Sequence, residues 1–334
     1  MAFDTEFLEA IAPLLEAQGT LAVLPIHDVE GRRARFNALR RPLTKLSDDV
    51  SYQIVNIAST DGLQIPVHCL KRQQPEGSGS SVLSTAAAIH AHGGGLISMS
   101  PEISIERLAN AVRDTGVQVF SVEYRLAPEH QYPAALDDFW ACLMWLHSEA
   151  ETLGIDPERI AVMGDSAGGG LAAAATLRAR QLALSPPIAI QILGSPMLDD
   201  RTVADTEGFS LWNAADNLTG WTAYLGRVPG ADNIPIFAAP GRMTDAKDLP
   251  PLYLDCGQLD IFAKENLSYV QKFVHAGVAT EFHLYPGLPH GFDALVPTHR
   301  VSQQLDENRK RVLNNLQDRV PKGHNRIQWQ GVPE

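Results

Sequence analysis

The stretch "IAVMGDSAGGGLAAAA" at residues 160–175 decides the fold of this 334-residue chain. An apolar run of the strand type leads into a polar turn, and three glycines then open an alanine-rich helix. Glycine inside a helix costs roughly 1 kcal/mol relative to alanine, so three in the first turn need a compensating reason. The stretch therefore predicts a strand, a tight turn and a helix that approaches its neighbours closely.

The alternation of strand and helix continues on both sides of this stretch. Further strands are expected at 52–59, 63–71, 86–92, 117–124, 188–194, 251–257 and 280–286, and helices at 100–116, 132–154, 262–277 and 299–316. The first two strands have the pattern of an antiparallel pair. Such an alternation predicts an α/β fold with a mostly parallel sheet and helices on both of its faces.

Two segments lie outside the alternation, at residues 1–50 and 200–247. Residues 51–199 and 248–320 carry the pattern and form the expected main domain, followed by a polar tail at 321–334. The first segment has apolar residues at helical spacing, namely Phe7, Leu8, Ile11, Leu14 and Leu15. The second lies between two core strands, beside the carboxyl ends at which parallel sheets bind ligands. It is therefore expected to form a lid or a pocket wall.

The composition favours a protein that acts on small molecules. A formal charge of −12 and a pI near 5.4 disfavour nucleic acid, whose binding depends on Lys and Arg contacts to phosphate. The N-terminus lacks the pattern of a signal peptide, and no stretch has the apolar length of a membrane span. Cys69, Cys142 and Cys256 lack metal-ligand spacing, so reduced core thiols and a cytoplasmic location are expected, while a homo-oligomer is left open.

Residues Gly164 to Gly168 match the pattern G-x-S-x-G between a predicted strand and a predicted helix. In a nucleophile elbow the serine occupies a strained turn that exposes its Oγ above the sheet. Larger side chains two residues before or after Ser166 would collide with the neighbouring strand and helix. The alternative is an ordinary turn in which Ser166 only caps the helix.

A second glycine-rich stretch, His92-Gly93-Gly94-Gly95, follows the strand expected at 86–92. Backbone amides without side chains around them suit a developing oxyanion, and HGGG accompanies the elbow in lipases and esterases. Gly93 and Gly94, together with Ala167, are therefore the expected oxyanion-hole donors. A phosphate-binding loop is the alternative, but neither G-x-G-x-x-G nor a following Lys-Ser/Thr is present.

A serine nucleophile needs a base and a residue that orients the base. His290 lies in the Pro- and Gly-bounded segment "YPGLPHGFDAL" after the last expected strand, and Asp260 follows the strand before it. The order Ser166, Asp260, His290 is the one found in α/β-hydrolases. These residues are the expected catalytic triad.

Other titratable residues are candidates for a functional site. His90 and His92 share a strand face and could be metal ligands, but no further ligand spacing supports a metal site. His283 alternates with apolar residues and is expected on a polar strand face. Asp255 lies inside its expected strand, where it is poorly placed to meet a histidine in a loop.

Five motifs together resemble those of the hormone-sensitive-lipase-like branch of the α/β-hydrolases. They are HGGG at 92–95, VEYRLAPEHQYPAALDD at 122–138, GDSAGGGLA at 164–172, LDIF at 259–262 and HGF at 290–292. The resemblance implies an eight-stranded sheet, a helical cap built from residues 1–50 and 200–247, and hydrolysis of small, short-acyl carboxylic esters without a cofactor. It implies Ser166, Asp260 and His290 as the triad and Gly93, Gly94 and Ala167 as the oxyanion-hole donors.

Two local features depart from or extend this resemblance. Relatives often carry an Asp-Pro-Leu-Arg-Asp-Glu-like run, whereas this chain reads Asp-Ile-Phe-Ala-Lys-Glu at 260–265. In the second motif, Tyr124, Arg125 and Glu129 could be taken for acid–base groups. A buried pair of Arg125 with Glu129 that shapes the turn is the expected arrangement instead.

Substrate selection is expected to depend on the two segments outside the alternation. Their apolar and aromatic side chains are candidates for a pocket wall or for plain packing: Phe7, Leu211, Trp212 and Trp221. The expected partner is a small ester, with a lactonase, an amidase or a natural-product esterase as alternatives that use the same residues. A non-catalytic receptor on this fold is disfavoured because His290 is present. An acyltransferase is a further alternative that no feature of the sequence favours.

Overall fold

The computed structural model describes residues 2–18, 24–38, 43, 45–73, 84–203 and 210–319. The tail expected from residue 321 lies outside these ranges. The strands are β1 Val50–Ala58, β2 Gln64–Arg72, β3 Thr85–Ala91, β4 Gln118–Val122, β5 Ile155–Asp165, β6 Ile190–Gly194, β7 Leu252–Gly257 and β8 Thr280–Tyr285. The α-helices are α1 Thr5–Gln18, α2 Val29–Ala38, α3 Ile105–Thr115, α4 Ala134–Ser148, α5 Ala150–Leu153, α6 Ala167–Gln181, α7 Ala214–Leu225, α8 Ala263–His275, α9 Phe292–Leu295 and α10 Arg300–Gln317, with short 3₁₀ turns at Pro101–Ile103 and Pro240–Arg242.

The strands form one eight-stranded sheet in the order β1-β2-β4-β3-β5-β6-β7-β8. β2 runs antiparallel to β1 and β4, and the remaining neighbours are parallel. This confirms the α/β-hydrolase architecture with a mostly parallel sheet. Two expected helices are shorter or divided: a 3₁₀ turn precedes α3, and Glu149 separates α4 from α5.

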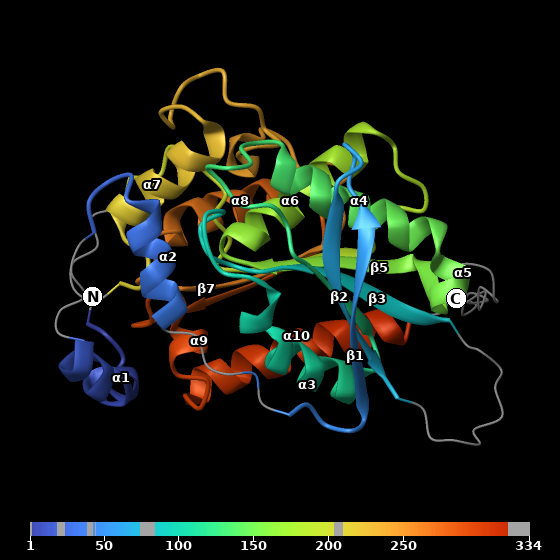
Figure 1. Ribbon diagram of the computed structural model, residues 1–334, viewed down its shortest axis with the longest axis horizontal. Coiled ribbons are helices and arrows are strands. Elements are labelled where there is room, and N and C mark those ends of the chain that lie inside the picture. The colour runs from blue at the N-terminus through green and yellow to red at the C-terminus, as the bar shows by residue number, and fades with distance from the viewer. Residues whose placement is uncertain are drawn as a thin grey trace, which may run out of the picture.

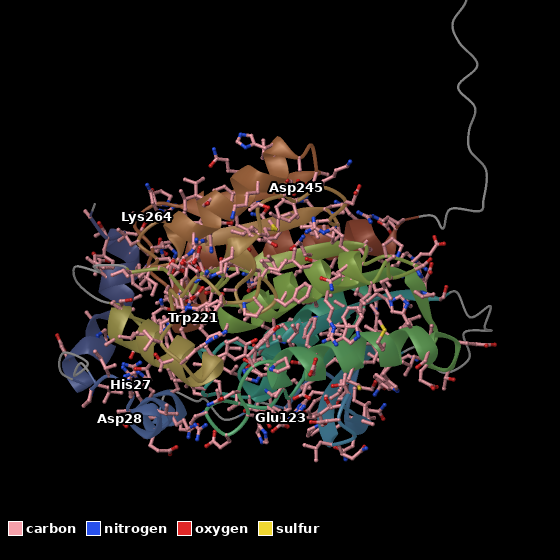
Figure 2. The ribbon with its side chains drawn as sticks, turned by 90° about the horizontal axis from the view of Figure 1, so that it is seen from above. His27, Asp28, Glu123, Trp221, Asp245 and Lys264 are labelled. Atoms are coloured by element: carbon pink, nitrogen blue, oxygen red, sulfur yellow. The ribbon has the colours of Figure 1, made fainter. Side chains whose placement is uncertain are left out.

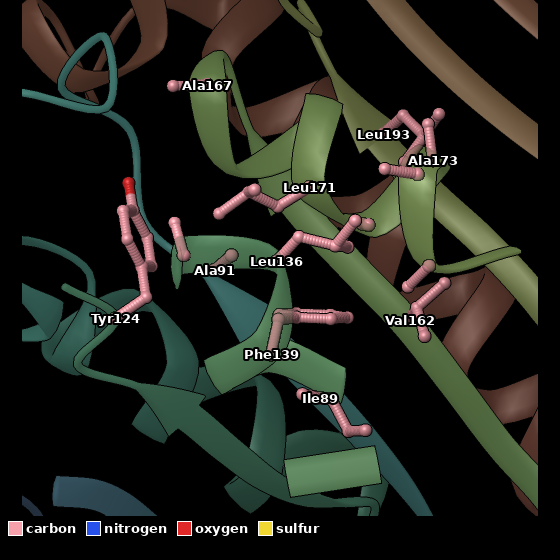
Figure 3. Close-up of a cluster of buried hydrophobic side chains, with 14 of the residues drawn as sticks. Ile89, Ala91, Tyr124, Leu136, Phe139, Val162, Ala167, Leu171, Ala173 and Leu193 are labelled. Atoms are coloured by element: carbon pink, nitrogen blue, oxygen red, sulfur yellow. The ribbon is translucent and has the colours of Figure 1, made fainter. Parts of the chain in front are cut away.

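Helices cover both faces of the sheet (Figure 1). α4, α6 and α8 lie on one face, and α3 and α10 lie on the other. Under the first group, apolar side chains of β3, β5 and β6 meet those of α4 and α6, as Figure 3 shows for Ile89, Phe139, Val162 and Leu171. All of these side chains are at most 2% exposed. The site therefore stands on a sheet packed from both sides.

The glycines that open α6 let this helix approach its neighbours. A Cβ on Gly168 would overlap the carbonyl oxygens of Ala91 and His92, and one on Gly164 would overlap Gly168 itself. A Cβ on Gly169 would lie 2.8 Å from the Cβ of Pro196, inside any ordinary contact distance. The prediction of close packing around the elbow is thus confirmed.

The segment before β1 and the insertion before β7 meet in space. α2 packs on α7, where the guanidinium Nε of Arg32 lies 2.9 Å from Asp216 and both side chains are fully buried. Arg35 reaches the same carboxylate from α2, also at 2.9 Å. Each partner of an ion pair buried this completely depends on the other, because removing one leaves an unpaired charge out of water.

α1 is held against the end of the chain instead. Phe7 and Ile11 are buried against Tyr285, Leu288 and Phe292, whereas Leu8 is 39% exposed. The buried apolar face of α1 is therefore narrower than predicted. The side chains of Leu14 and Leu15 lie outside what the structure describes. At its start, a carboxylate oxygen of Asp4 accepts a hydrogen bond from the Phe7 amide at 3.1 Å and the other pairs with Arg300.

Among the helices of the described ranges, none has the length and apolar character needed to cross a membrane. Cys69, Cys142 and Cys256 are buried and free, as expected of core thiols.

Candidate active site

Ser166 stands at the junction of β5 and α6, at the carboxyl end of the sheet. Its backbone has φ 55° and ψ −118°, a conformation that L residues rarely adopt and that holds the side chain above the strand. The amide of Ser166 donates to the carbonyl of Gly194 at 2.7 Å, and its own carbonyl accepts from Met197 and Gly170. These bonds fix the strained turn between two neighbouring strand ends.

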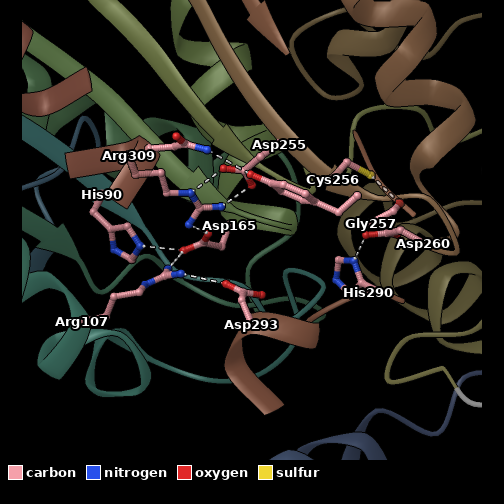
Figure 4. Close-up of polar contacts among 12 residues, drawn as sticks. His90, Arg107, Asp165, Asp255, Cys256, Gly257, Asp260, His290, Asp293 and Arg309 are labelled. Carbon is pink, nitrogen blue, oxygen red and sulfur yellow. Dashed lines mark hydrogen bonds and ion pairs between the residues drawn. The ribbon is translucent and has the colours of Figure 1, made fainter. Parts of the chain in front are cut away.

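Two loops bring a histidine and a carboxylate to this serine. His290 follows β8 and its Nε2 lies 3.0 Å from the Oγ of Ser166. Asp260 follows β7 and its Oδ2 lies 2.7 Å from the Nδ1 of His290, as Figure 4 shows. Asp260 and His290 are buried, so their contact is shielded from water. The structure thus brings the three residues of the expected triad into one hydrogen-bonded line.

The unusual sequence after Asp260 forms a well-packed support for this line. The second oxygen of Asp260 accepts from the amide of Phe262 at 2.8 Å. The Phe262 ring is fully buried and meets the ring of His290 edge-on, with 5.1 Å between centroids. Further along, the buried Glu265 accepts from the amide of Leu198 at 2.6 Å. The departure from the family's pattern therefore leaves the aspartate in place.

The charge around His290 favours its protonated form. Burial lowers the pKa of His290, but the carboxylates of Asp260, Asp293 and Asp165 outweigh burial and hold it above its ordinary value. A positive imidazolium would be stabilised here, as a general base requires after it has accepted a proton.

The HGGG stretch lies directly beside the elbow. A Cβ on Gly93 would lie 3.5 Å from the Cβ of Ser166, and Gly94 has φ 115°, which favours glycine. No acceptor within the described part of the chain is found for the amides of Gly93, Gly94 and Ala167. These three donors are therefore free to meet a ligand next to Ser166.

His92 and Tyr124 keep this glycine stretch in position. The Tyr124 hydroxyl donates to the His92 carbonyl at 2.8 Å, and the two rings stack with 4.2 Å between centroids. Burial lowers the pKa of His92 to about 3, so the ring stays neutral at any ordinary pH. His90 is bonded differently, to the Ser121 hydroxyl at 2.8 Å. Both histidines thus have partners within the protein.

A cavity of about 1010 Å³ opens above Ser166 and His290. Leu211 and Trp212 line it from the insertion, and Phe36 lines it from α2. The rings of Phe36 and Trp212 stack at 6.0 Å, and Trp212 occupies the space that a side chain on Gly95 would need. The two segments outside the main domain therefore supply an aromatic wall over the glycine stretch.

Phe7 and Trp221 are absent from the described residues that line this cavity, which corrects their assignment to the pocket wall. The Phe7 side chain points into the apolar cluster between α1 and α9. Trp221 packs against Tyr224 with 1% of its surface exposed. Figure 2 shows Trp221 inside the molecule, while His27 and Asp28 lie nearer its outline. Helical spacing alone does not indicate which apolar side chain faces a cavity and which faces the core.

The pairing expected between Arg125 and Glu129 is wrong. Arg125 binds Asp138 at 2.7 Å and Asp61 at 2.6 Å, whereas Glu129 binds Arg33 at 2.7 Å. Asp138 is completely buried on α4 and needs a cation, while Glu129 is exposed beside α2. Of the other residues weighed, His283 pairs with Glu281 on the last strand, and Asp255 pairs with Arg309 instead of His290.

Sequence reasoning missed a charged network behind the elbow. Asp165, the residue before Ser166, is bound by Arg107 of α3 and Arg309 of α10 (Figure 4). The signal in the sequence is the aspartate inside the elbow motif, because this residue type must be paired when it is buried. Neither arginine belongs to any of the five motifs.

Comparison with known proteins agrees with this geometry. Residues 88–294 match the family model described as the alpha/beta hydrolase fold. The chain is 29% identical to the ethyl acetate hydrolase of Pseudomonas putida over 94% of its own length and 98% of that protein. It is 36% identical to the carboxylesterase NlhH of Mycobacterium tuberculosis, over 61% of this chain and 65% of that protein.

The same relationship holds for solved structures. A bacterial heroin esterase superposes with a TM-score of 0.83 at 32% identity, over 95% of this chain and 98% of that one. The chain therefore belongs to the α/β hydrolase fold family, in the branch that resembles hormone-sensitive lipase, and is a carboxylesterase.

Proposed function

We propose that this carboxylesterase hydrolyses small, short-acyl esters through Ser166, His290 and Asp260 with an acyl-enzyme intermediate. One observation carries the proposal: Ser166 Oγ, His290 Nε2, His290 Nδ1 and Asp260 Oδ2 form a continuous line with contacts of 3.0 and 2.7 Å. A nucleophile in contact with a base, and a base in contact with an orienting carboxylate, are the requirements of this chemistry.

In the proposed mechanism, Ser166 Oγ attacks the ester carbonyl carbon while His290 Nε2 accepts the hydroxyl proton. Asp260 fixes the imidazole tautomer and stabilises the imidazolium that forms. The tetrahedral oxyanion accepts hydrogen bonds from the amides of Gly93, Gly94 and Ala167. Donors aimed at this oxygen stabilise the transition state more than the substrate, and loss of one typically costs on the order of 10²–10³ in rate.

The intermediate then collapses to an acyl-enzyme, which water hydrolyses. The C–O bond to the alcohol breaks, and His290 gives its proton to the leaving alkoxide, which leaves the acyl group on Ser166. Water next attacks the acyl carbon and gives a proton to His290. The second tetrahedral intermediate releases the carboxylic acid, and the proton on His290 returns to Ser166 Oγ.

The choice of short-acyl esters has two supports. The Pseudomonas putida relative is named for ethyl acetate, an ester with a two-carbon acyl group. Trp212 also fills the space directly over Gly95, which limits the room beside the glycine stretch. Lactonase, amidase and natural-product esterase activities use the same residues and remain the alternatives. We further propose that residues 1–50 and 200–247 form the cap that selects among them.

Hydrolysis of p-nitrophenyl esters from acetate to palmitate, with Ser166→Ala in parallel, tests this proposal. Activity that peaks at short chains and disappears in Ser166→Ala is the expected result. Wild type that is inert on every ester, but labelled at Ser166 by a serine-directed phosphonate, would indicate a specialised substrate. If the wild type shows no turnover and is not labelled, the proposed triad is overturned.

A further inference from the structure

Arg107 connects the two loops that carry the proposed nucleophile and the proposed base. Its Nη2 contacts Asp165, the residue directly before Ser166. Its Nη1 donates to Asp293 at 2.9 Å, and Asp293 lies three residues after His290, in α9. Figure 4 shows this bridge beside the pair of Asp260 and His290. One guanidinium on α3 thus joins the elbow to the histidine loop from a third element.

A second arginine holds the same aspartate from the opposite side. Arg309 of α10 donates to the other oxygen of Asp165 at 2.9 Å and makes two contacts with Asp255, at 2.6 and 2.7 Å. A side chain on Gly194 would overlap both Arg309 and Asp165, so the end of β6 leaves room for this contact. The nucleophile elbow is therefore tied to α3, α10 and β7 by charge-assisted bonds.

We propose that Arg107 is a positioning residue: it sets the distance between the Ser166 elbow and the His290 loop, and it neutralises carboxylates that face His290. The proposal rests on the proposed triad. Arg107 also lines the cavity over Ser166, and the proposed role acts through the two loops and not through a contact with the substrate. Bidentate arginine contacts fix geometry as well as charge, and a lysine cannot reproduce this fork.

The charges around His290 show why neutralisation matters. Three carboxylates face it: Asp260 after β7, Asp165 at the end of β5, and Asp293 in α9. Arg107 and Arg309 are cations of this network, and Lys310 acts on its Asp306 as a third. Asp255 and the buried His90 are also part of it. Although burial favours the neutral acid, the two arginines hold the pKa of Asp165 well below its ordinary value, so it stays charged.

Two substitutions break the same bridge with opposite electrostatic effects. Arg107→Gln removes a cation and leaves Asp165 and Asp293 less neutralised, so the acid limb of kcat/KM should move to a pH about half a unit to one unit higher. Asp293→Asn removes a carboxylate near His290, so the limb should move down by a similar amount. Both variants should lose about tenfold in kcat, because both release the histidine loop from the elbow.

Arg178→Gln provides a matched control on the far side of the sheet. Arg178 of α6 pairs with Asp137 of α4, and its side chain is 26% exposed against 29% for Arg107. This control should lose stability at most and keep the wild-type pH profile. Arg107→Lys should keep the acid limb near wild type while losing kcat, since it retains the charge but not the fork.

Phosphonate labelling of Ser166 in each variant separates this inference from the proposed triad. A wild-type protein that is not labelled contradicts the triad. If Arg107→Gln and Asp293→Asn are both labelled but keep the wild-type acid limb, or if their limbs move in the same direction, the role of Arg107 is overturned. If Arg107→Gln does not fold, Arg107→Lys decides the question: a wild-type kcat in that variant overturns the role of Arg107.

Discussion

The carboxyl edge of the sheet and the helices that lie over it differ in how their residues are constrained. At the edge, Ser166 has a backbone conformation that few sequences permit, and Gly164 and Gly168 leave no room for any Cβ. Over it, Phe36 and Trp212 meet through side chains alone, from segments far apart in the chain. The first region depends on backbone geometry, and the second depends on packing.

From this difference we expect the proposed chemistry and the proposed selection of substrate to respond differently to substitution. A strained turn surrounded by backbone atoms tolerates almost no change, because backbone atoms cannot move aside as side chains can. A wall of apolar side chains can be repacked with modest loss, provided that its volume is conserved. We therefore expect substitutions at the edge to destroy turnover or folding, and substitutions in the wall to change the preferred ester.

The largest expected effect is in the proposed triad. Asp260→Asn should lower kcat on p-nitrophenyl acetate by about 10⁴-fold, because the amide no longer selects the productive tautomer of His290. Steady-state kinetics would measure it. Asp138→Asn is the control, since Asp138 is also a completely buried aspartate but binds Arg125. Equal losses of kcat in the two variants would contradict a special role for Asp260.

The second effect tests the backbone constraint. Gly168→Ala should lower the free energy of unfolding by about 3 kcal/mol, because its Cβ overlaps two carbonyl oxygens. Gly62→Ala should cost about 1 kcal/mol, since Gly62 has φ 84° but nothing within 4 Å of an added Cβ. Urea unfolding measures both. A Gly168→Ala protein as stable as Gly62→Ala would show that the elbow is less crowded than its geometry implies.

A third substitution tests the aromatic wall. Trp212→Ala opens space over Gly95, so the ratio of kcat/KM for p-nitrophenyl octanoate to that for acetate should rise about tenfold. Trp221→Phe, at a buried residue outside the cavity lining, should leave this ratio unchanged. If this ratio rises in both variants, the preference for short acyl chains does not depend on Trp212 specifically.

The smallest expected effect is electrostatic. The pKa of His290 is raised above its ordinary value of 6.5, and a general base must be neutral to accept a proton. Activity should therefore fall as the pH drops through a value above 6.5, and wild type at pH 6.5 should retain less than half of its plateau kcat/KM. Trp212→Ala should share this midpoint because the wall carries no charge. More than half of the plateau rate at pH 6.5 would contradict the raised pKa.

The features that could be predicted from the sequence share a local cause. The elbow combines strand, turn and glycine in one short segment, and its packing requires those glycines at those positions. Asp260 and His290 could be proposed because they directly follow expected strands, and the carboxyl ends of parallel strands lie at one edge. The eight-stranded sheet was implied by the resemblance and is confirmed.

The errors arise where a residue's partner lies elsewhere in the chain. Phe7 and Trp221 are residue types that suit a pocket wall, but α1 and α7 point their side chains into the core. Arg125 binds Asp138 on α4 instead of the nearer Glu129, because a buried carboxylate without a cation costs far more free energy than an exposed one. Side-chain type alone did not distinguish these environments.

The sequence by itself determined the sheet, the elbow around Ser166 and the identity of the two loop residues proposed to act with it, because backbone sterics and chain order act over short distances. Only the tertiary structure decided that Phe36 and Trp212 wall the cavity and that Arg107 joins Asp165 to Asp293. Those contacts depend on how helices turn on the sheet. That rotation is set by packing across the whole molecule, which no local pattern contains.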